Sequence, residues 1–351
     1  MADEADIQAV IDAVPGPIIA LDSRLMVVCF NASARAFAPS LRRNEPLSLA
    51  LRIPEVLEAS RRAAATGQAQ CSEFSERVPV DRWYEAQVTP VTVRMNVPGR
   101  GNIMLLSLHD LTPLRRADQM RADFVANASH ELRTPLAALS GFIETLQGPA
   151  RDDVAARERF LSIMRAQATR MARLIDDLLS LSRIELNAHL RPSTAVDLLS
   201  VVRQVTDGLE PLARDRDVVL AVRAPEKPIS VPGDRDELVR LFENLIENAL
   251  KYGASGKRVD ITLASVDAPG LQEARVSVRD YGPGIGAEHL PRLTERFYRV
   301  DVTESRAQGG TGLGLSLVKH ILNHHGGRLV IDSRPGEGAI FTARLPLATG
   351  T

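Results

Sequence analysis

The sequence predicts an α+β protein built from several domains, and two observations lead to that prediction. A chain of 351 residues is long enough to form two or three hydrophobic cores. Short strand-like and helical runs mix up to residue 112, a helical period follows, and strands mix with helices again from residue 196. We therefore expect three domains, at residues 1–112, 113–190 and 196–349.

Composition and charge exclude several classes of protein. The 43 basic and 44 acidic side chains nearly cancel, so binding of nucleic acid by bulk charge is not expected. Two cysteines, Cys29 and Cys71, do not predict a disulfide framework. No apolar run reaches the ~18–20 residues that cross a bilayer, and the acidic N-terminus lacks a signal pattern. We expect a cytoplasmic chain, anchored to a membrane only if an N-terminal segment is missing.

The first domain alternates short strands with helices. A Pro/Gly turn is expected at residues 94–101, and strands at residues 17–22, 25–30, 82–90 and 101–110. This order, which ends in Asp110-Leu111-Thr112 before a helix, resembles a PAS sensor domain. A small α+β spacer or dimerisation domain remains the alternative, because a fold does not fix a function.

A helical period begins at Pro113. Apolar residues recur every three or four positions from Phe124 to Leu146 and again from Phe160 to Leu181, and Gly148-Pro149 separates the two stripes. Two such helices predict an antiparallel hairpin. Each stripe is too narrow to be buried by a single partner helix, so we expect a homodimer that forms a four-helix bundle.

One histidine stands off the apolar stripe of the first helix. His130 lies two residues from its neighbours on the stripe, which is about 200° around the helix axis, so it should face solvent. Glu131 is adjacent, Thr134 lies one turn further, and Pro135 removes a helical hydrogen bond and predicts a bend. An isolated His130 would be an ordinary surface histidine, but this cluster of side chains predicts a nucleophilic imidazole.

The third domain reads as an α/β sandwich with a mixed sheet covered on one face. Residues 234–252 form an amphipathic helix, and we expect two further helices at residues 288–297 and 314–325. The expected strands lie at residues 259–264, 274–279, 328–332 and 340–345.

Three clusters in this domain predict a nucleotide site. Asn244 and Asn248 lie one helical turn apart, followed by Lys251 and Tyr252, and amide oxygens suit Mg²⁺ as lysine suits phosphate. Asp280 follows a strand, and its carboxylate can accept a hydrogen bond from an adenine amino group. Glycines that let the backbone approach a ligand follow it at Gly282, Gly284 and Gly286.

The last cluster opens a helix and predicts a phosphate cradle. Its backbone amides can line phosphate oxygens at a helix N-terminus, and its members are Gly310, Thr311, Gly312, Leu313 and Gly314. Either glycine cluster alone could be a tight turn. Neither matches a P-loop or a dinucleotide fingerprint.

Taken in order, five motifs resemble those of two-component sensor histidine kinases. They are FVANASHELRTPLAAL, ENLIENALKY, DYGPGIG, ERFYRVD and GGTGLGLSLVKHI. The resemblance covers residues 113–349, and the domain order looks like that of the phosphate-regulon sensors, which implies a possible response to phosphate.

The resemblance implies ATP and Mg²⁺ as cofactors. It implies that Asn248 binds the metal, that Asp280 reads adenine, that Arg299 contacts phosphate and that residues 300–311 form a mobile lid over ATP. At Ala339 the family often carries a hydroxyl, so a water-mediated adenine contact is in doubt there, and Thr342 lies on a different register.

From these residues we expect phosphoryl transfer from ATP to His130. Glu131 would accept a ring N–H of His130, acting as base and orienter. Asn244 cannot accept a proton from water, so we expect ATP to react with the histidine rather than quickly with water. The phosphoryl group would pass to an aspartate of a response-regulator receiver domain. Thr134 would position a water that removes phosphate from that regulator.

Two other functions remain open from the sequence. A silent scaffold could keep the fold without catalysis, although it would have no need for His130, Asn248 and Asp280 together. A plain ATPase or a serine kinase could share the nucleotide site, although the hairpin that carries His130 discriminates against it. His320 and His324, four apart on a helix, are expected to be solvated, because no third metal ligand accompanies them.

Overall fold

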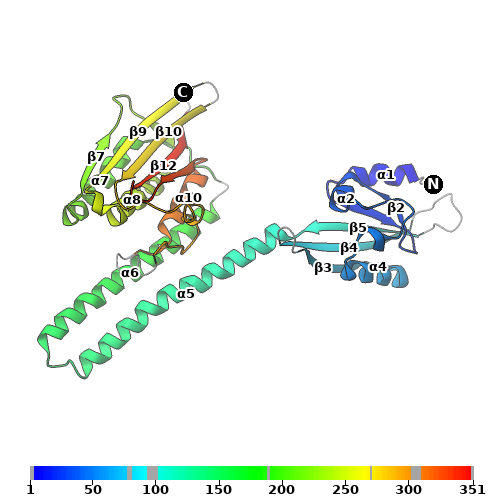
Figure 1. Cartoon of the computed structure of the whole chain (residues 1–351), viewed down its shortest axis with the longest axis horizontal. Coiled ribbons are helices and arrows are strands. Elements are labelled where there is room, and N and C mark those ends of the chain that lie inside the picture. Colours follow the sequence, from blue (N-terminus) through cyan, green and yellow to red (C-terminus); the bar gives the residue numbers. More distant parts are fainter. Residues whose placement is uncertain are drawn as a thin grey trace. The chain divides into compact units, whose positions relative to one another are not determined.

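The computed structural model describes residues 4–76, 81–92, 102–187, 190–268, 271–301 and 310–348. The chain divides into two compact units after Asp123 (Figure 1). The turn predicted at residues 94–101 lies outside the described residues. Among the described helices, none is both long enough and apolar enough to cross a membrane.

The first unit contains a five-stranded antiparallel sheet with the order β2-β1-β5-β4-β3. The hairpin and the two later strands expected from the sequence are confirmed, whereas β3 had not been anticipated. The strands are β1 (Ile18–Leu21), β2 (Val27–Phe30), β3 (Gln70–Glu76), β4 (Arg82–Thr92) and β5 (Asn102–Asp110).

Four helices accompany this sheet: α1 (Glu4–Asp12), α2 (Ala32–Phe37), α3 (Leu47–Ala50) and α4 (Pro54–Thr66). Buried Val56, Ala59 and Ala63 recur at helical spacing on α4, which packs beside β3 and β4. Asn31 caps α2 by accepting from the N–H of Ala34 at 2.9 Å, and its amide donates to carbonyls near the end of α1. This unit therefore has a core of its own.

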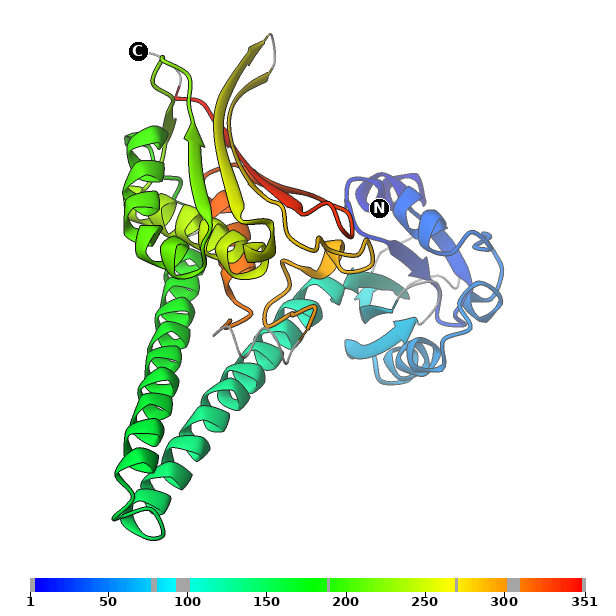
Figure 2. The same cartoon turned by 60° about the vertical axis from the view of Figure 1, so that its left-hand side comes forward.

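The predicted helical hairpin is confirmed as α5 (Thr112–Gln147) and α6 (Val154–Leu186). Helix α5 begins where Asp110 accepts from the N–H of Thr112, and it continues through Pro135. Asp153 caps α6 by accepting from the N–H of Ala156. Figure 2 shows α6 running from the hairpin turn directly into the C-terminal part of the chain.

The C-terminal sandwich (residues 190–348) contains a five-stranded sheet with the order β11-β12-β10-β9-β7. Strands β7 and β9 pair in parallel and the other pairs are antiparallel, so the predicted mixed sheet is confirmed. The strands are β7 (Val219–Arg223), β9 (Arg258–Ala268), β10 (Leu271–Asp280), β11 (Arg328–Ser333) and β12 (Ala339–Pro346). A small separate sheet pairs β6 (Ala195–Asp197) with β8 (Ser230–Pro232).

Three helices cover one face of the five-stranded sheet: α7 (Leu198–Asp215), α8 (Arg235–Tyr252) and α10 (Gly314–His324). Helix α7 was missed. The helix predicted at residues 288–297 is wrong, because only a 3₁₀ turn forms at Leu290–Arg292. Pro291 restricts the residue before it, and Phe297 takes a left-handed conformation (φ 63), which no α-helix continues through.

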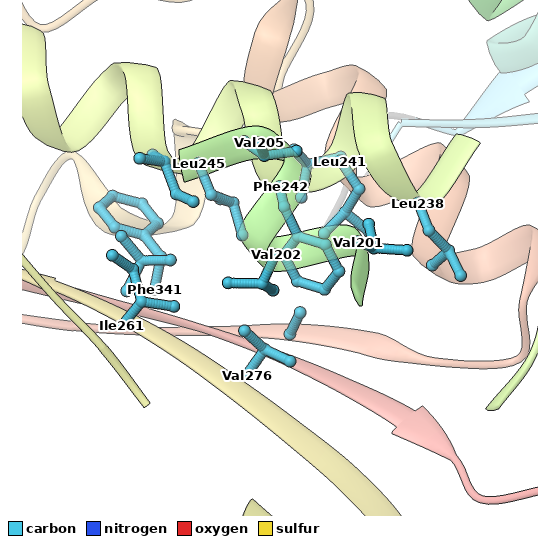
Figure 3. Close-up of a cluster of buried hydrophobic side chains, with 14 of the residues drawn as sticks. Val201, Val202, Val205, Leu238, Leu241, Phe242, Leu245, Ile261, Val276 and Phe341 are labelled. Atoms are coloured by element: carbon cyan, nitrogen blue, oxygen red, sulfur yellow. The ribbon is translucent and has the colours of Figure 1, made fainter. Parts of the chain in front are cut away.

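The core of the sandwich lies between its helices and its sheet (Figure 3). Val201 and Val202 of α7 and Phe242 of α8 point toward Ile261 and Val276 of the sheet. Leu181 and Ile184, in the last turns of α6, belong to the same buried cluster. The second helix of the hairpin is therefore anchored in the core of the sandwich.

Candidate functional site

A cavity of about 900 Å³ lies beside α8 and collects most of the predicted nucleotide-site residues. Its lining includes Asn244, Asn248, Lys251, Tyr252, Asp280, Gly284, Arg299, Gly310, Thr311, Gly312 and Gly314. Gly282, Gly286 and Leu313 are not among the lining residues. Helix α6 adds Arg173, Asp176 and Asp177, which the sequence analysis did not identify.

The paired asparagines, Asn244 and Asn248, both line this cavity. The side-chain amide of Asn244 donates to the carbonyl of Arg240 at 2.8 Å, which fixes the orientation of the group. A Cβ at Gly314 would lie only 2.5 Å from Oδ1 of Asn244, so a side chain there would force the amide of Asn244 to shift. Carboxylates of Asp177, Glu243 and Glu247 line the same space. This oxygen-rich set of donors fits Mg²⁺.

Lys251 is buried beside a carboxylate. Its Nζ lies 2.9 Å from Oε1 of Glu247, and its side chain is 9% exposed. The same oxygen of Glu247 lies 3.3 Å from Arg173 of α6. Lys251 therefore forms an ion pair with Glu247 in this structure, and its predicted contact with phosphate stays a prediction. Tyr252, which is 40% exposed, also lines the cavity.

Asp280 is held by the backbone on two sides. Its Oδ1 accepts from the N–H of Gly282 at 3.0 Å and from the N–H of Ala339 at 3.2 Å. Burial raises the pKa of this carboxyl, and the two backbone hydrogen bonds oppose that rise. Because one oxygen is occupied, the second oxygen keeps the capacity to accept from a ligand. Thr342 instead exchanges a 2.9 Å hydrogen bond with Ser277.

Close packing explains Gly282 and Gly284 in the cluster that follows Asp280. A Cβ at Gly282 would lie 2.6 Å from Cα of Gly253, and one at Gly286 would meet the carboxylate of Glu288. Gly284 combines a positive φ (+70°) with a Cβ position only 1.9 Å from the carbonyl oxygen of Arg334. Substitution there is strained in two independent ways.

We expect Gly284→Ala to lower the free energy of unfolding by about 2–4 kcal/mol, because a left-handed alanine and a backbone clash add together. Thermal and denaturant unfolding measure this loss. Gly336→Ala is the matched control, because Gly336 has a φ of +83° and nothing within 4 Å of its Cβ position. Equal losses in the two variants would contradict the clash.

His130 lies exposed on α5, as predicted, and is not among the residues that line the cavity. Thr134 is also exposed, and its hydroxyl donates to the carbonyl of His130 at 3.2 Å. Glu131 pairs instead with two guanidinium groups, those of Arg170 at 3.0 Å and Arg299 at 2.9 Å. The hydrogen bond from the ring of His130 to Glu131 and the role of Glu131 as base stay predictions.

Arg299 connects the hairpin to the glycine-rich loop. Its side chain is 5% exposed, and it donates to Glu131 and to the carbonyl of Gly310 at 3.1 Å. Its Nε is buried and has no hydrogen-bond partner among the described residues. A guanidinium with donor capacity left over beside this cavity fits an oxyanion ligand such as a phosphate.

Asp177 forms a second connection of the same kind. Its carboxylate accepts from the hydroxyl of Thr311 at 3.0 Å and lies 3.3 Å from Arg240. Burial raises the pKa of Asp177, while Thr311 and Arg240 oppose the rise. Two residues predicted to meet phosphate, Arg299 and Thr311, thus contact carboxylates of the hairpin. Residues 302–309 of the predicted lid lie outside the described residues.

The expectation that His324 is solvated is wrong. It is 7% exposed, and its ring lies against Glu237 of α8. Its partners come from segments far apart in the sequence, so no local pattern could have placed them.

Residues 120–187 match the model of the His Kinase A phospho-acceptor domain, and residues 233–349 match that of the histidine kinase-, DNA gyrase B- and HSP90-like ATPase. The phosphate regulon sensor protein PhoR of Pseudomonas aeruginosa is 39% identical over 238 residues, which are 68% of this chain and 53% of PhoR. The sensor protein kinase WalK of Staphylococcus aureus is 35% identical over 239 residues, which are 68% of this chain and 57% of WalK.

Among solved structures, the histidine kinase AdeS of Acinetobacter baumannii is similar to this chain with a TM-score of 0.50 and 26% identity. The match covers 63% of this chain and 98% of AdeS. The chain spans about half the length of the curated relatives PhoR and WalK.

Proposed function

Because this chain belongs to the family of two-component sensor histidine kinases, we propose that it transfers the γ-phosphoryl group of ATP to His130. The observation that carries the proposal is the contact between Glu131, next to His130, and Arg299, which lines the nucleotide cavity. It joins the phosphoacceptor helix to the nucleotide cavity. The proposed domains are residues 1–112, 113–190 and 196–349.

The cavity supports ATP as the phosphoryl donor. Asp280 would accept from the adenine amino group, and Asn248, with Asn244, would hold Mg²⁺, which when bound neutralises charge on the phosphates. Lys251 and Arg299 would add positive charge. The backbone amides of residues 310–314 would line the phosphate oxygens at the N-terminus of α10.

Arg299 exchanges partners in the mechanism that we propose. A phosphate competes with the carboxylate of Glu131 for the guanidinium, so nucleotide binding would draw Arg299 away from Glu131. Glu131 would keep its ion pair with Arg170 and accept the N–H of the His130 ring. The unprotonated ring nitrogen then attacks phosphorus, the N–P bond forms, and the bond to the β-phosphate oxygen breaks with ADP as leaving group. The ring proton moves toward Glu131.

A homodimer and a response regulator complete the proposal. Large apolar side chains remain half exposed on both hairpin helices at seven-residue intervals or multiples of seven, at Leu136 and Ile143 of α5 and at Leu161 and Ile175 of α6. Such a stripe supports packing of a second hairpin into a four-helix bundle. The phosphohistidine would pass its phosphoryl group to an aspartate of a receiver domain.

The first unit supports a sensor domain of the PAS type. Its five antiparallel strands follow the order 2-1-5-4-3, with α2, α3 and α4 between β2 and β3. The 39% identity to PhoR is the support for the narrower proposal that signalling responds to phosphate.

Incubation with γ-labelled ATP tests the proposed function. We expect label that is lost in acid and retained in alkali, as phosphohistidine is, and that moves to an added receiver domain. A silent scaffold would take up no label. A plain ATPase would release phosphate without labelling the protein, and a serine kinase would give an acid-stable product.

We expect Thr134→Ala to slow dephosphorylation of the receiver domain by about tenfold or more, because the hydroxyl that orients water is lost. Autophosphorylation should be unchanged, since Thr134 is exposed and does not line the cavity. Release of phosphate from purified phosphoregulator measures the first rate. Thr145→Ala is the control, because the hydroxyl of Thr145, also on α5, donates in the same way to the carbonyl of Gly141, one helical turn before it. An equal effect of both substitutions would contradict the proposed role.

A further inference from the structure

A buried histidine at the end of α10 faces hydrogen-bond acceptors on both ring nitrogens. Nδ1 of His324 lies 2.8 Å from Oε2 of Glu237, and Nε2 lies 2.7 Å from the carbonyl oxygen of Leu190. A neutral imidazole has one N–H and can donate to only one of them. An imidazole outcompetes a carboxylate for a shared proton, because its ordinary pKa is about 2 units higher. The geometry therefore identifies His324 as an imidazolium ion.

The surroundings of His324 favour this charge. Burial alone would lower the pKa of His324, but the hydrogen bonds to Glu237 and to the carbonyls of Leu190 and Asn187 outweigh it, and the pKa is raised. Other titratable or charged side chains near this end of α8, α10 and α6 are Asp234, His325, His320, Arg191 and Glu185. Of these groups, Glu237 makes the direct ion pair.

The next residue provides an internal comparison. Nε2 of His325 accepts from the N–H of Asp234 at 3.0 Å, so Nδ1 carries the ring proton and donates to the carbonyl of Ile321 at 2.8 Å. Because Nδ1 donates and Nε2 accepts, the ring of His325 is neutral, with its single proton on Nδ1. Burial lowers the pKa of His325. Two adjacent buried histidines therefore differ in charge: His324 is an imidazolium ion and His325 is neutral.

A metal ion is the alternative occupant of this cluster. Glu237, His324 and His325 each offer one ligand atom, and these atoms lie within 4.8 Å of one another. His325 has no lone pair left for a metal, because its Nε2 accepts from the N–H of Asp234 and its Nδ1 carries the ring proton. Without His325, Glu237 and His324 are too few ligands for a protein metal site. The hydrogen-bond pattern favours a proton over a cation.

We propose that protonated His324 is a pH-sensitive clamp on Leu190, which follows α6 and begins the C-terminal sandwich. The clamp ties Leu190 to the first turn of α8 and the last turn of α10. Under the proposed function, the sandwich must move relative to the hairpin for the nucleotide to reach His130. The charge on His324 would then set how strongly Leu190, where the sandwich follows α6, is bound to α8 and α10.

The sign of the pH dependence follows from the raised pKa. The stabilisation by His324 is fully present below the unfolded pKa of about 6.5 and is lost as the pH rises through the higher folded pKa. His325 has the opposite sign, because its lowered pKa makes its stabilisation present above about 6.5 and lost as the pH falls through the folded value. Raising the pH should therefore open the clamp while leaving His325 unchanged.

Titration of the imidazole resonances of the full chain by NMR, without nucleotide, tests the clamp. We expect His324 to titrate above the ordinary value and Glu237→Gln to lower its pKa by about one pH unit or more. Glu185→Gln is the matched control, because Glu185 lies near His320 instead and should leave the titration of His324 unchanged. An ordinary or lowered pKa for His324, or equal effects of the two substitutions, would overturn the clamp.

Hydrogen exchange gives a second readout near Leu190. After correction for intrinsic rates, we expect the amides of residues 190–196 to exchange about tenfold faster at about pH 9 than at about pH 6. In His324→Gln the corrected rates should be high at both values. Unchanged exchange, or zinc binding that shifts the His325 resonances, would overturn the proposal. Neither readout needs catalysis, so a failure of phosphoryl transfer would leave the clamp standing.

Discussion

Replacing His130 with glutamine should abolish phosphorylation of the chain, with a loss of at least about 1,000-fold. Glutamine is close to histidine in size but has no ring nitrogen that can attack phosphorus. Because His130 is exposed on α5 and does not line the cavity, ATP binding and thermal stability should stay at wild-type levels. Acid-labile label from γ-labelled ATP measures the loss, and a fluorescent nucleotide measures the binding.

His109→Gln serves as the matched control for this variant. His109 is also exposed, but it lies on β5 in the first unit and should keep full labelling. Retained acid-labile label in His130→Gln would place the phosphoacceptor elsewhere. Loss of label together with loss of nucleotide binding would contradict the separation between His130 and the cavity.

Replacing Asp280 with asparagine should weaken ATP binding by about 100-fold or more. Asparagine keeps the oxygen that accepts from the N–H groups of Gly282 and Ala339, so the local backbone is preserved. Its second polar atom becomes an NH₂ group, which would face the adenine amino group with two donors and no acceptor. Calorimetric titration with ATP measures the change, and autophosphorylation should fall in parallel at limiting nucleotide.

Asp236→Asn provides the control for charge. Asp236 lines the same cavity and loses the same charge, but it is exposed on the first turn of α8 and makes no such backbone contacts through its side chain in the described structure. We expect its affinity for ATP to change little. An equal loss of ATP affinity in both variants would show that Asp280 acts through its charge in the cavity rather than through a hydrogen bond to adenine.

Local patterns predicted most of the regular elements. Helix α8, the hairpin and four strands of the C-terminal sheet follow from spacing alone, because burial of one face imposes a period of 3.6 or 2 on the sequence. The helix expected at residues 288–297 is wrong, because only a 3₁₀ turn forms at Leu290–Arg292, where Pro291 has no N–H to donate to a helical carbonyl. Helix α7 was overlooked, although its apolar face is buried.

The sequence by itself determined the family, the helical hairpin that carries His130 and most of the predicted residues that line the cavity beside α8, because each motif is contiguous and its chemistry is local. Only the tertiary structure decided which charges meet. It paired Glu131 with Arg170 and Arg299, Thr311 with Asp177, and His324 with Glu237 and the Leu190 carbonyl. These partners come from different elements, and a buried charge is tolerated only where the fold brings an opposite charge or a dipole to it. No period or spacing along the sequence predicts these contacts.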